Sequence, residues 1–177
     1  WQGILRAAIN LVLTGKKAQG GSTITMQVAR NFFLSNEKTY LRKVNEIFLA
    51  LKIEQQLSKA EILELYLNKI YLGQRAYGIG AASQVYYGST IQDLTLPQIA
   101  TIAGLPKAPS TTNPVTSREK AGERRAYVLR RMLDLDFISH QEYEQAKNSP
   151  VTGSLHRPAV LIKAPYVAEM VRLAMVE

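Results

Sequence analysis

The stretch Gly20-Gly21-Ser22-Thr23-Ile24-Thr25-Met26-Gln27 joins a pair of glycines to the start of a helix pattern, and Arg30 follows one turn later. Glycine allows backbone amides to come close to a ligand, and the first turn of a helix presents free N–H groups that attract anions. A guanidinium group nearby adds hydrogen-bond donors that match phosphate oxygens. This stretch therefore predicts a helix over residues 23–33 with a site for a phosphorylated ligand at its start.

A group of three charged residues follows, with Arg42 and Lys43 one helical turn before Glu46. Residues three and four apart lie on one face of a helix, where an exposed ion pair contributes about 0.2–0.5 kcal/mol. The same carboxylate beside two cations also suits proton transfer or binding at a phosphorylated ligand. Spacing alone leaves both interpretations open, and the ion pair is the commoner of the two.

The helix expected over residues 39–56 is apolar on two sides. The stripe predicted to face the core consists of Leu41, Val44, Ile47, Phe48 and Leu51. Leu49 and Ile53 lie on the opposite side, together with Glu46. Since a helix with two apolar sides is usually buried, we expect this helix to be central and Glu46 to lie at the mouth of a cleft.

The rest of the chain predicts more helices and no sheet, so the expected fold class is mostly α. Helix patterns begin near residue 4 and cover about 58–71, 79–87, 95–104 and 117–134, with a short one after Ser139. Three of these starts have the sequence of a capping box, a hydroxyl residue followed three positions later by Glu or Gln. The only stretch that favours a strand is the short apolar run 159–162 between two prolines.

Composition limits the class of protein and of partner. The chain has 177 residues, of which 46% are hydrophobic, so it is globular, and it contains no cysteine. Its formal net charge of +8 indicates an anionic partner, which could be nucleic acid, an anionic membrane or a phosphorylated substrate. No apolar run approaches the ~20 residues of a membrane-spanning helix, and no signal peptide is visible.

Four motifs in order carry a resemblance to a known family. They are GGSTIT-x-Q at residues 20–27, RK-x-x-E at 42–46, KAEILELYLN at 59–68 and RRAYVL at 124–129. Together they resemble the peptidoglycan glycosyltransferase domain of glycosyltransferase family 51, as found in class A penicillin-binding proteins of Gram-negative bacteria. The resemblance implies a lysozyme-like, mostly α domain over residues 1–150, and residues 151–177 as the start of a linker toward a transpeptidase domain.

The resemblance also assigns roles to residues. It implies that Glu46 is a catalytic carboxylate. The residues expected to bind substrate are Gly21, Ser22, Thr23, Gln27, Arg30, Arg42 and Lys43. Those expected to support the structure are Lys59, Glu61, Glu64, Tyr66, Asn68, Arg124 and Arg125. Met26 stands where the family usually has Gln, and we expect it to pack in the core.

The family's first motif, E-D-x-x-F-x-x-H-x-G, carries the catalytic base and is not found in these 177 residues. We expect it just upstream, and we expect these residues by themselves to be inactive. With that motif, the family polymerises lipid II into glycan strands, with inversion at C1 of MurNAc and release of undecaprenyl pyrophosphate. The resemblance implies no required cofactor, although a divalent cation on the pyrophosphate is compatible with it, and no cluster of residues predicts a metal site.

The partners implied are lipid II, the growing glycan chain, moenomycin-type inhibitors and a membrane surface, without nucleic acid. The location implied is the periplasmic face of a bacterial inner membrane. Two alternatives remain from other classes. One is a helical nucleic-acid-binding module, although the basic residues are scattered through several helices instead of lying on one recognition helix. The other is a catalytically inactive binding module.

Overall fold

The computed structural model describes residues 22–33, 39–156 and 165–175 of the chain, and these residues are mainly helical. The helices are α2 (Ile24–Phe33), α3 (Tyr40–Gln56), α4 (Lys59–Lys69), α5 (Ile79–Tyr87), α6 (Leu96–Gly104), α7 (Arg118–Asp134), α8 (His140–Asn148) and α9 (Pro165–Ala174), with the short 3₁₀ turns η1 (Ile91–Asp93) and η2 (Leu105–Lys107). No strand forms in these ranges, where a single β-bridge joins Tyr71 to Tyr77. The mostly α prediction is confirmed.

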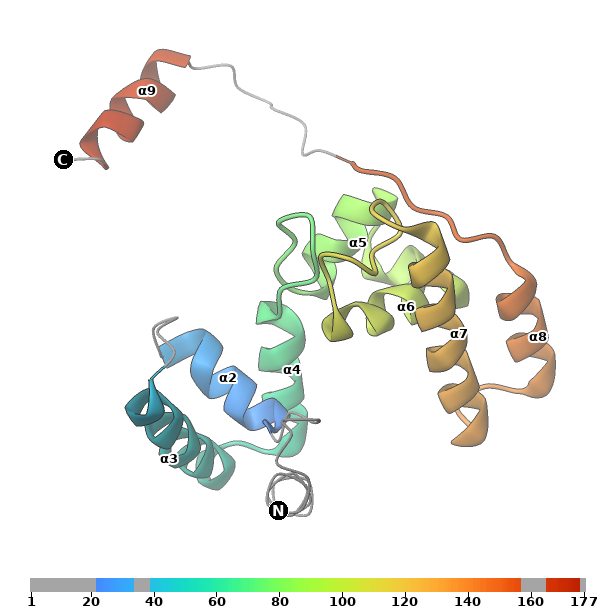
Figure 1. Cartoon of the computed structure of the whole chain (residues 1–177), viewed down its shortest axis with the longest axis horizontal. Helices are drawn as coiled ribbons and strands as arrows, with labels where there is room; N and C mark the ends of the chain where they lie inside the picture. The colour runs from blue at the N-terminus through green and yellow to red at the C-terminus, as the bar shows by residue number, and fades with distance from the viewer. Residues whose placement is uncertain (1–21, 34–38, 157–164, 176–177) are drawn as a thin grey trace.

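The helices form two groups that meet at α4 and α5 (Figure 1). The first group consists of α2, α3 and α4, and the second group of α5, α6, α7 and α8. The larger core joins α2 and α4 to α5 and α6, and its buried residues are Val28, Ile62, Tyr66, Ile70, Leu72, Ala76, Ala82, Tyr86, Ile102 and Leu105. A smaller core holds α6, α7 and α8 together through Ala100, Leu129, Ile138, Tyr143 and Ala146. Because α6 contributes to both cores, it connects the two groups.

The predicted helix starts agree with the structure. Capping boxes form at Ser58, Thr95 and Ser139, and Gly88 ends α5 in the left-handed conformation. Helix α4 ends at Lys69, slightly earlier than predicted. Met26 is buried, as expected. The helix predicted from residue 4 and the strand predicted at 159–162 lie outside the described residues.

The prediction for the core face of α3 was wrong. The five residues of its main apolar stripe are exposed, led by Leu41 at 71% and Phe48 at 66%. The buried residues of α3 are Glu46 and Ala50, with Ile53 packed against the larger core. A helical wheel shows which residues share a face but not which face meets a neighbour, and here α2 and α4 pack on the less apolar side. Helix α3 is therefore an outer helix and not a central one.

Helix α9 stands apart from the other helices in Figure 1, and the side chains described on it are exposed. The boundary expected at residue 150 stays a prediction. None of the helices in the described part of the chain combines the length and apolar character needed to cross a membrane.

The loop between α4 and α5 depends on close contacts with the second helix group. The Tyr86 hydroxyl donates to the Leu72 carbonyl over 2.8 Å inside the core. Gly73 follows with φ +88°, and a Cβ atom there would lie 2.4 Å from the Pro109 carbonyl oxygen. Glycine is required at this position both for its backbone conformation and for the close approach.

We expect Gly73→Ala to lower the free energy of unfolding by at least about 2 kcal/mol, because it combines strain at positive φ with a backbone clash. Gly80→Ala is the matched control: Gly80 lies in α5, and a Cβ atom there would meet only Ile91 at 3.8 Å. It should be neutral or stabilising by up to about 1 kcal/mol. Urea denaturation of both variants checks this, and equal effects would contradict it.

Candidate active site

Glu46 is at the centre of a charged cluster between α2 and α3. Its side chain is only 1% exposed. Oε2 accepts a hydrogen bond from Arg42 Nη1 at 2.9 Å, and Oε1 accepts from Lys43 Nζ at 2.5 Å and from Ser22 Oγ at 3.0 Å. Lys43 Nζ also donates to Ser22 Oγ at 3.2 Å. The ion pair of Arg42 with Glu46 therefore exists, but it is one part of a partly buried four-residue network.

Local sequence places these groups. Thr39 caps α3 by accepting from the Arg42 backbone N–H, so the helix begins just before the two cations. Glu46 follows one turn later and faces the start of α2. There Thr23 accepts from the Met26 backbone N–H as a helix cap, while Ser22 turns to Glu46. Capping thus accounts for one of the two hydroxyl residues.

The surroundings of Glu46 favour its ionised form. Burial alone raises the pKa of this carboxyl, but hydrogen bonds from Lys43 and Ser22, together with the positive charges of Lys43 and Arg30, outweigh burial. The net effect is a pKa below the ordinary value. A carboxylate of this kind is a weak base, and its main physical effect is to fix the position of two cations.

The other residues expected to bind substrate are less tightly held. Arg30 is exposed in the last turn of α2, and its charge lowers the pKa of Glu46 and opposes the rise that burial causes at Tyr66. Its guanidinium therefore lies near both groups and remains accessible. Gln27 is half-buried on the same helix. Gly21 lies outside the described residues.

A second polar cluster, which sequence reasoning missed, joins the same helices about two turns further along α3. The buried Thr25 donates to Glu54 Oε1 at 2.6 Å, and Lys59 Nζ lies 2.5 Å from Glu54 Oε2. Both bonds lower the pKa of Glu54, with Lys59 contributing most. They connect α2, α3 and α4 beside a largely apolar pocket of about 540 Å³. The clue in the sequence was Thr25, the last hydroxyl residue of the first motif.

The residues expected to be structural take different positions. Glu61 completes the capping box of α4, and Tyr66 is buried in the core, whereas Glu64 and Asn68 are exposed.

The two arginines of α7 contact neighbouring segments. Arg124 lies over the Tyr127 ring at 4.6 Å and donates to the Gly104 carbonyl. Arg125 is buried and donates to three carbonyls at the end of α8. The hydrogen bonds of Glu61, Arg124 and Arg125 therefore stabilise helix ends and do not reach the Glu46 cluster.

The arrangement suits binding of a phosphorylated anion. Arg42 and Lys43 are held in fixed positions by one carboxylate, and Arg30 supplies a third positive charge nearby. The ammonium group of Lys43 and the exposed guanidinium of Arg30 are donors that suit phosphate oxygens. Among the described residues, no group of three His, Asp or Glu side chains gathers in a way that could hold a metal ion.

The chain belongs to the transglycosylase family, whose model matches residues 1–133. It is similar to penicillin-binding protein 1A of Vibrio cholerae, with 59% identity over 175 residues that cover 99% of this chain and 21% of that protein. For the Escherichia coli protein of the same name, identity is 56% over 173 residues, covering 98% of this chain and 20% of that protein.

A crystal structure of penicillin-binding protein 1A from Haemophilus influenzae is similar with a TM-score of 0.56 and 41% identity, covering 86% of this chain and 19% of that one. The chain thus spans about a fifth of the length of these relatives. The matches confirm the family resemblance drawn from the four motifs, and the helical fold agrees with it. The role of each site residue stays a prediction.

We expect Glu46→Gln to lower the free energy of unfolding by about 1–3 kcal/mol near neutral pH, because two cations lose their counter-charge. A carboxyl with a lowered pKa stabilises the fold above its unfolded-state pKa, and this stabilisation disappears as pH falls through the folded-state value. The difference between wild type and variant should therefore shrink below about pH 4.5. Urea denaturation across pH measures it.

The matched control is Glu64→Gln, which changes an exposed carboxylate on α4. It should alter stability by no more than about 0.5 kcal/mol at any pH. A Glu46→Gln effect that stays constant or grows on acidification would contradict a lowered pKa.

Proposed function

We propose that this chain contributes the glycosyltransferase site of an enzyme that polymerises lipid II into peptidoglycan glycan strands. The observation that carries the proposal is the network in which the buried Glu46 binds Arg42, Lys43 and Ser22, which come from two motifs of the transglycosylase family. In the proposed reaction, the acceptor 4-hydroxyl of GlcNAc attacks C1 of MurNAc in the donor chain. Undecaprenyl pyrophosphate leaves, and the configuration at C1 inverts.

The cations act on the leaving group. Negative charge grows on the pyrophosphate as the bond to C1 breaks, and donors already in position stabilise it without reorganisation. Arg42 and Lys43 are such donors because Glu46 fixes them, while the exposed Arg30 can approach the outer phosphate. A phosphoglycolipid inhibitor of the moenomycin type presents a similar charge and would compete for the same cations.

A different group must accept the proton of the attacking hydroxyl. Glu46 has a lowered pKa and both of its oxygens accept hydrogen bonds from positive groups, so it is poorly suited to take that proton. We assign the role of proton acceptor to the carboxylate of the family's first motif. A divalent cation does not fit at Glu46 for the same reason, since neither oxygen is left without a donor.

Turnover of lipid II tests the proposal, in a polypeptide that carries both this segment and the family's first motif. Glu46→Gln should abolish polymerisation, and Lys43→Ala and Arg30→Ala should each slow it by about 10²–10³ with Lys43 the larger effect. Arg30→Lys should be nearly silent because it keeps the charge. Lys52→Ala, an exposed cation on α3, is the control and should leave turnover unchanged.

Two outcomes would contradict this account. Unchanged turnover in Glu46→Gln would mean that Glu46 is only the partner of an ordinary ion pair and has no role in the reaction. An Arg30→Lys variant as slow as Arg30→Ala would show that the site needs the guanidinium fork and not simply positive charge.

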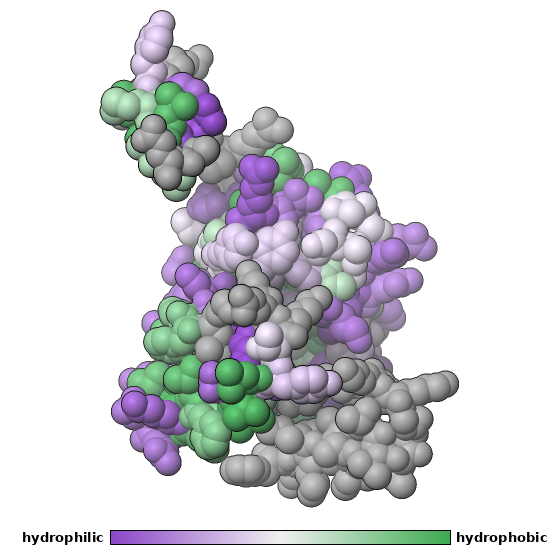
Figure 2. Space-filling model, turned by 60° about the vertical axis from the view of Figure 1, so that its left-hand side comes forward, coloured by the Kyte–Doolittle hydropathy of each residue, from purple (hydrophilic) through white to green (hydrophobic). Residues whose placement is uncertain are grey.

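We further propose that the exposed apolar face of α3 rests on a membrane surface. This face consists of Leu41, Val44, Ile47, Phe48 and Leu51. Figure 2 shows apolar side chains gathered in the lower part of the molecule, where α3 lies in Figure 1. An amphipathic helix with such a face binds at the headgroup level, and a net charge of +8 adds attraction to anionic lipids. Lipid II is anchored in a membrane, which for this family is the bacterial inner membrane.

We expect Phe48→Asp to weaken binding to vesicles of phosphatidylethanolamine and phosphatidylglycerol by about tenfold or more, because it removes the burial of one aromatic side chain. Phe137→Asp is the matched control, since Phe137 is also exposed, at 74%, but lies between α7 and α8. Sedimentation with vesicles measures both, and equal losses would mean that charge alone determines binding.

A further inference from the structure

Arg125 is a buried cation that has no counter-ion among the described residues. It is only 6% exposed. Its Nη1 donates to the Pro150 carbonyl at 3.0 Å, and its Nη2 donates to the carbonyls of Ser149 at 2.6 Å and Lys147 at 3.5 Å. Within the part of the chain that the structure describes, no carboxylate forms an ion pair with it. Buried charges in proteins are normally paired, so this exception calls for a physical reason.

The carbonyl contacts explain only part of this environment. They satisfy the C-terminal end of α8 and supply partial negative charge, but burial still lowers the pKa of Arg125, and the neighbouring Tyr87 only partly offsets this. Two of the three guanidinium nitrogens make these bonds, while Nε makes none with a described group. The side chain therefore keeps both an unneutralised charge and a donor.

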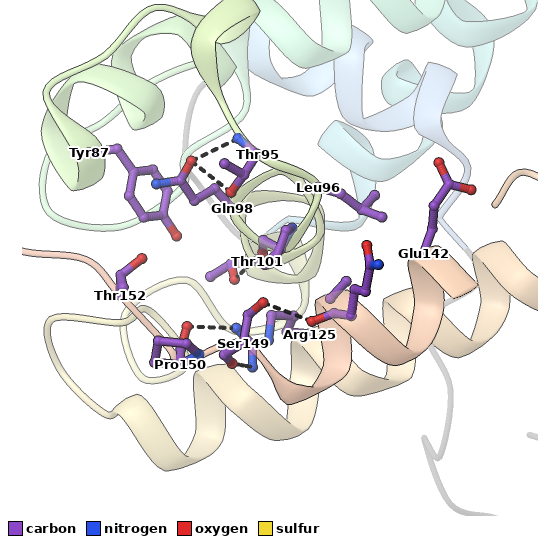
Figure 3. A pocket seen from close by; sticks show the side chains of 13 residues that line it. Tyr87, Thr95, Leu96, Gln98, Thr101, Arg125, Glu142, Ser149, Pro150 and Thr152 are labelled. Carbon is purple, nitrogen blue, oxygen red and sulfur yellow. Dashed lines mark hydrogen bonds between the residues drawn. The ribbon is translucent and has the colours of Figure 1, made fainter. Parts of the chain in front are cut away.

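A pocket of about 490 Å³ opens beside Arg125, between α6, α8 and the segment that follows α8 (Figure 3). This volume is in the range of small-molecule sites. Hydroxyl and amide groups of Tyr87, Gln98, Gln145 and Thr152 line it, and Leu96, Pro97 and Ala146 supply apolar surface. The pocket lies in the second group of helices, and none of its lining residues belongs to the Glu46 cluster.

The charges of the lining select the kind of ligand. Arg125 is the single cation among the described residues that line the pocket, so a dianionic phosphate would remain half neutralised. Glu142 also lines it and is a carboxylate, but its Oε2 accepts from the Ser139 backbone and hydroxyl, so its charge is held at a helix cap and forms no ion pair with Arg125. A monoanionic group with an adjacent amide or hydroxyl fits one guanidinium and a set of neutral donors.

We propose that this pocket binds a small organic carboxylate, with the carboxylate as the counter-ion of Arg125 and the amides of Gln98 and Gln145 contacting its polar substituents. The proposal goes beyond the glycosyltransferase function and does not depend on it. It assigns to Arg125, which also holds the end of α8, a ligand-binding role.

The test is titration of the purified, ¹⁵N-labelled protein with N-acetylglycine, followed by amide chemical shifts. N-acetylglycinamide is the neutral probe of similar shape, and equimolar sodium chloride controls for ionic strength. We expect saturable shifts at Thr101, Gln145 and Thr152 with N-acetylglycine, and binding of the neutral amide that is weaker by about tenfold or more. Absence of shifts at these residues, or equal shifts with the two probes, would overturn the proposal.

Variants distinguish binding in the pocket from binding elsewhere on the surface. Gln145→Ala changes an exposed side chain that lines the pocket, so the fold should persist while the affinity for N-acetylglycine falls. Gln141→Ala, one turn earlier on α8 and outside the lining, should leave that affinity unchanged. Arg125→Lys keeps the charge but loses the planar fork and should weaken binding further. Equal affinities in Gln145→Ala and Gln141→Ala would count against the site.

Discussion

The placement of the Glu46 carboxylate beneath Arg42, Lys43 and Ser22 is the interaction on which the proposed site depends. It connects a residue just before α2 to the first half of α3, although 24 positions separate them. Removing a carboxylate from water is costly unless strong donors replace the water, and here two cations and a hydroxyl do so. The same contacts restrict the conformations of the two cationic side chains, so fixed positive charges are available before any ligand binds.

The remainder of the fold supports this arrangement. Thr25, Glu54 and Lys59 join the three helices of the first group. Tyr66 of α4 and Ile70 just after this helix lie in the core shared with α5 and α6. The loop after α4 is held by Tyr86 and by the close approach of Gly73 to Pro109. The second group thus acts as a base for the first, and it also encloses the pocket at Arg125.

Much of the fold was predictable because its signals are local. Capping boxes and helical spacing depend on residues three or four apart, and these predictions agree with the structure. The core face of α3 was not predictable from the wheel, since the choice between two apolar faces depends on packing with α2 and α4. Motif spacing placed Glu46 beside its cations, but Glu54 and the pocket at Arg125 depend on contacts between distant segments, for which the sequence has no periodic pattern.

The central claim is that Glu46 is an ionised anchor for cations and not a proton acceptor. A ¹³C NMR titration of the Glu46 side-chain carboxyl measures this directly in the folded protein. The account predicts a pKa clearly below the ordinary value of 4.5, which rises in Lys43→Ala as a donor and a positive charge are lost. A pKa at or above the ordinary value, or one that does not respond to the loss of Lys43, would contradict it.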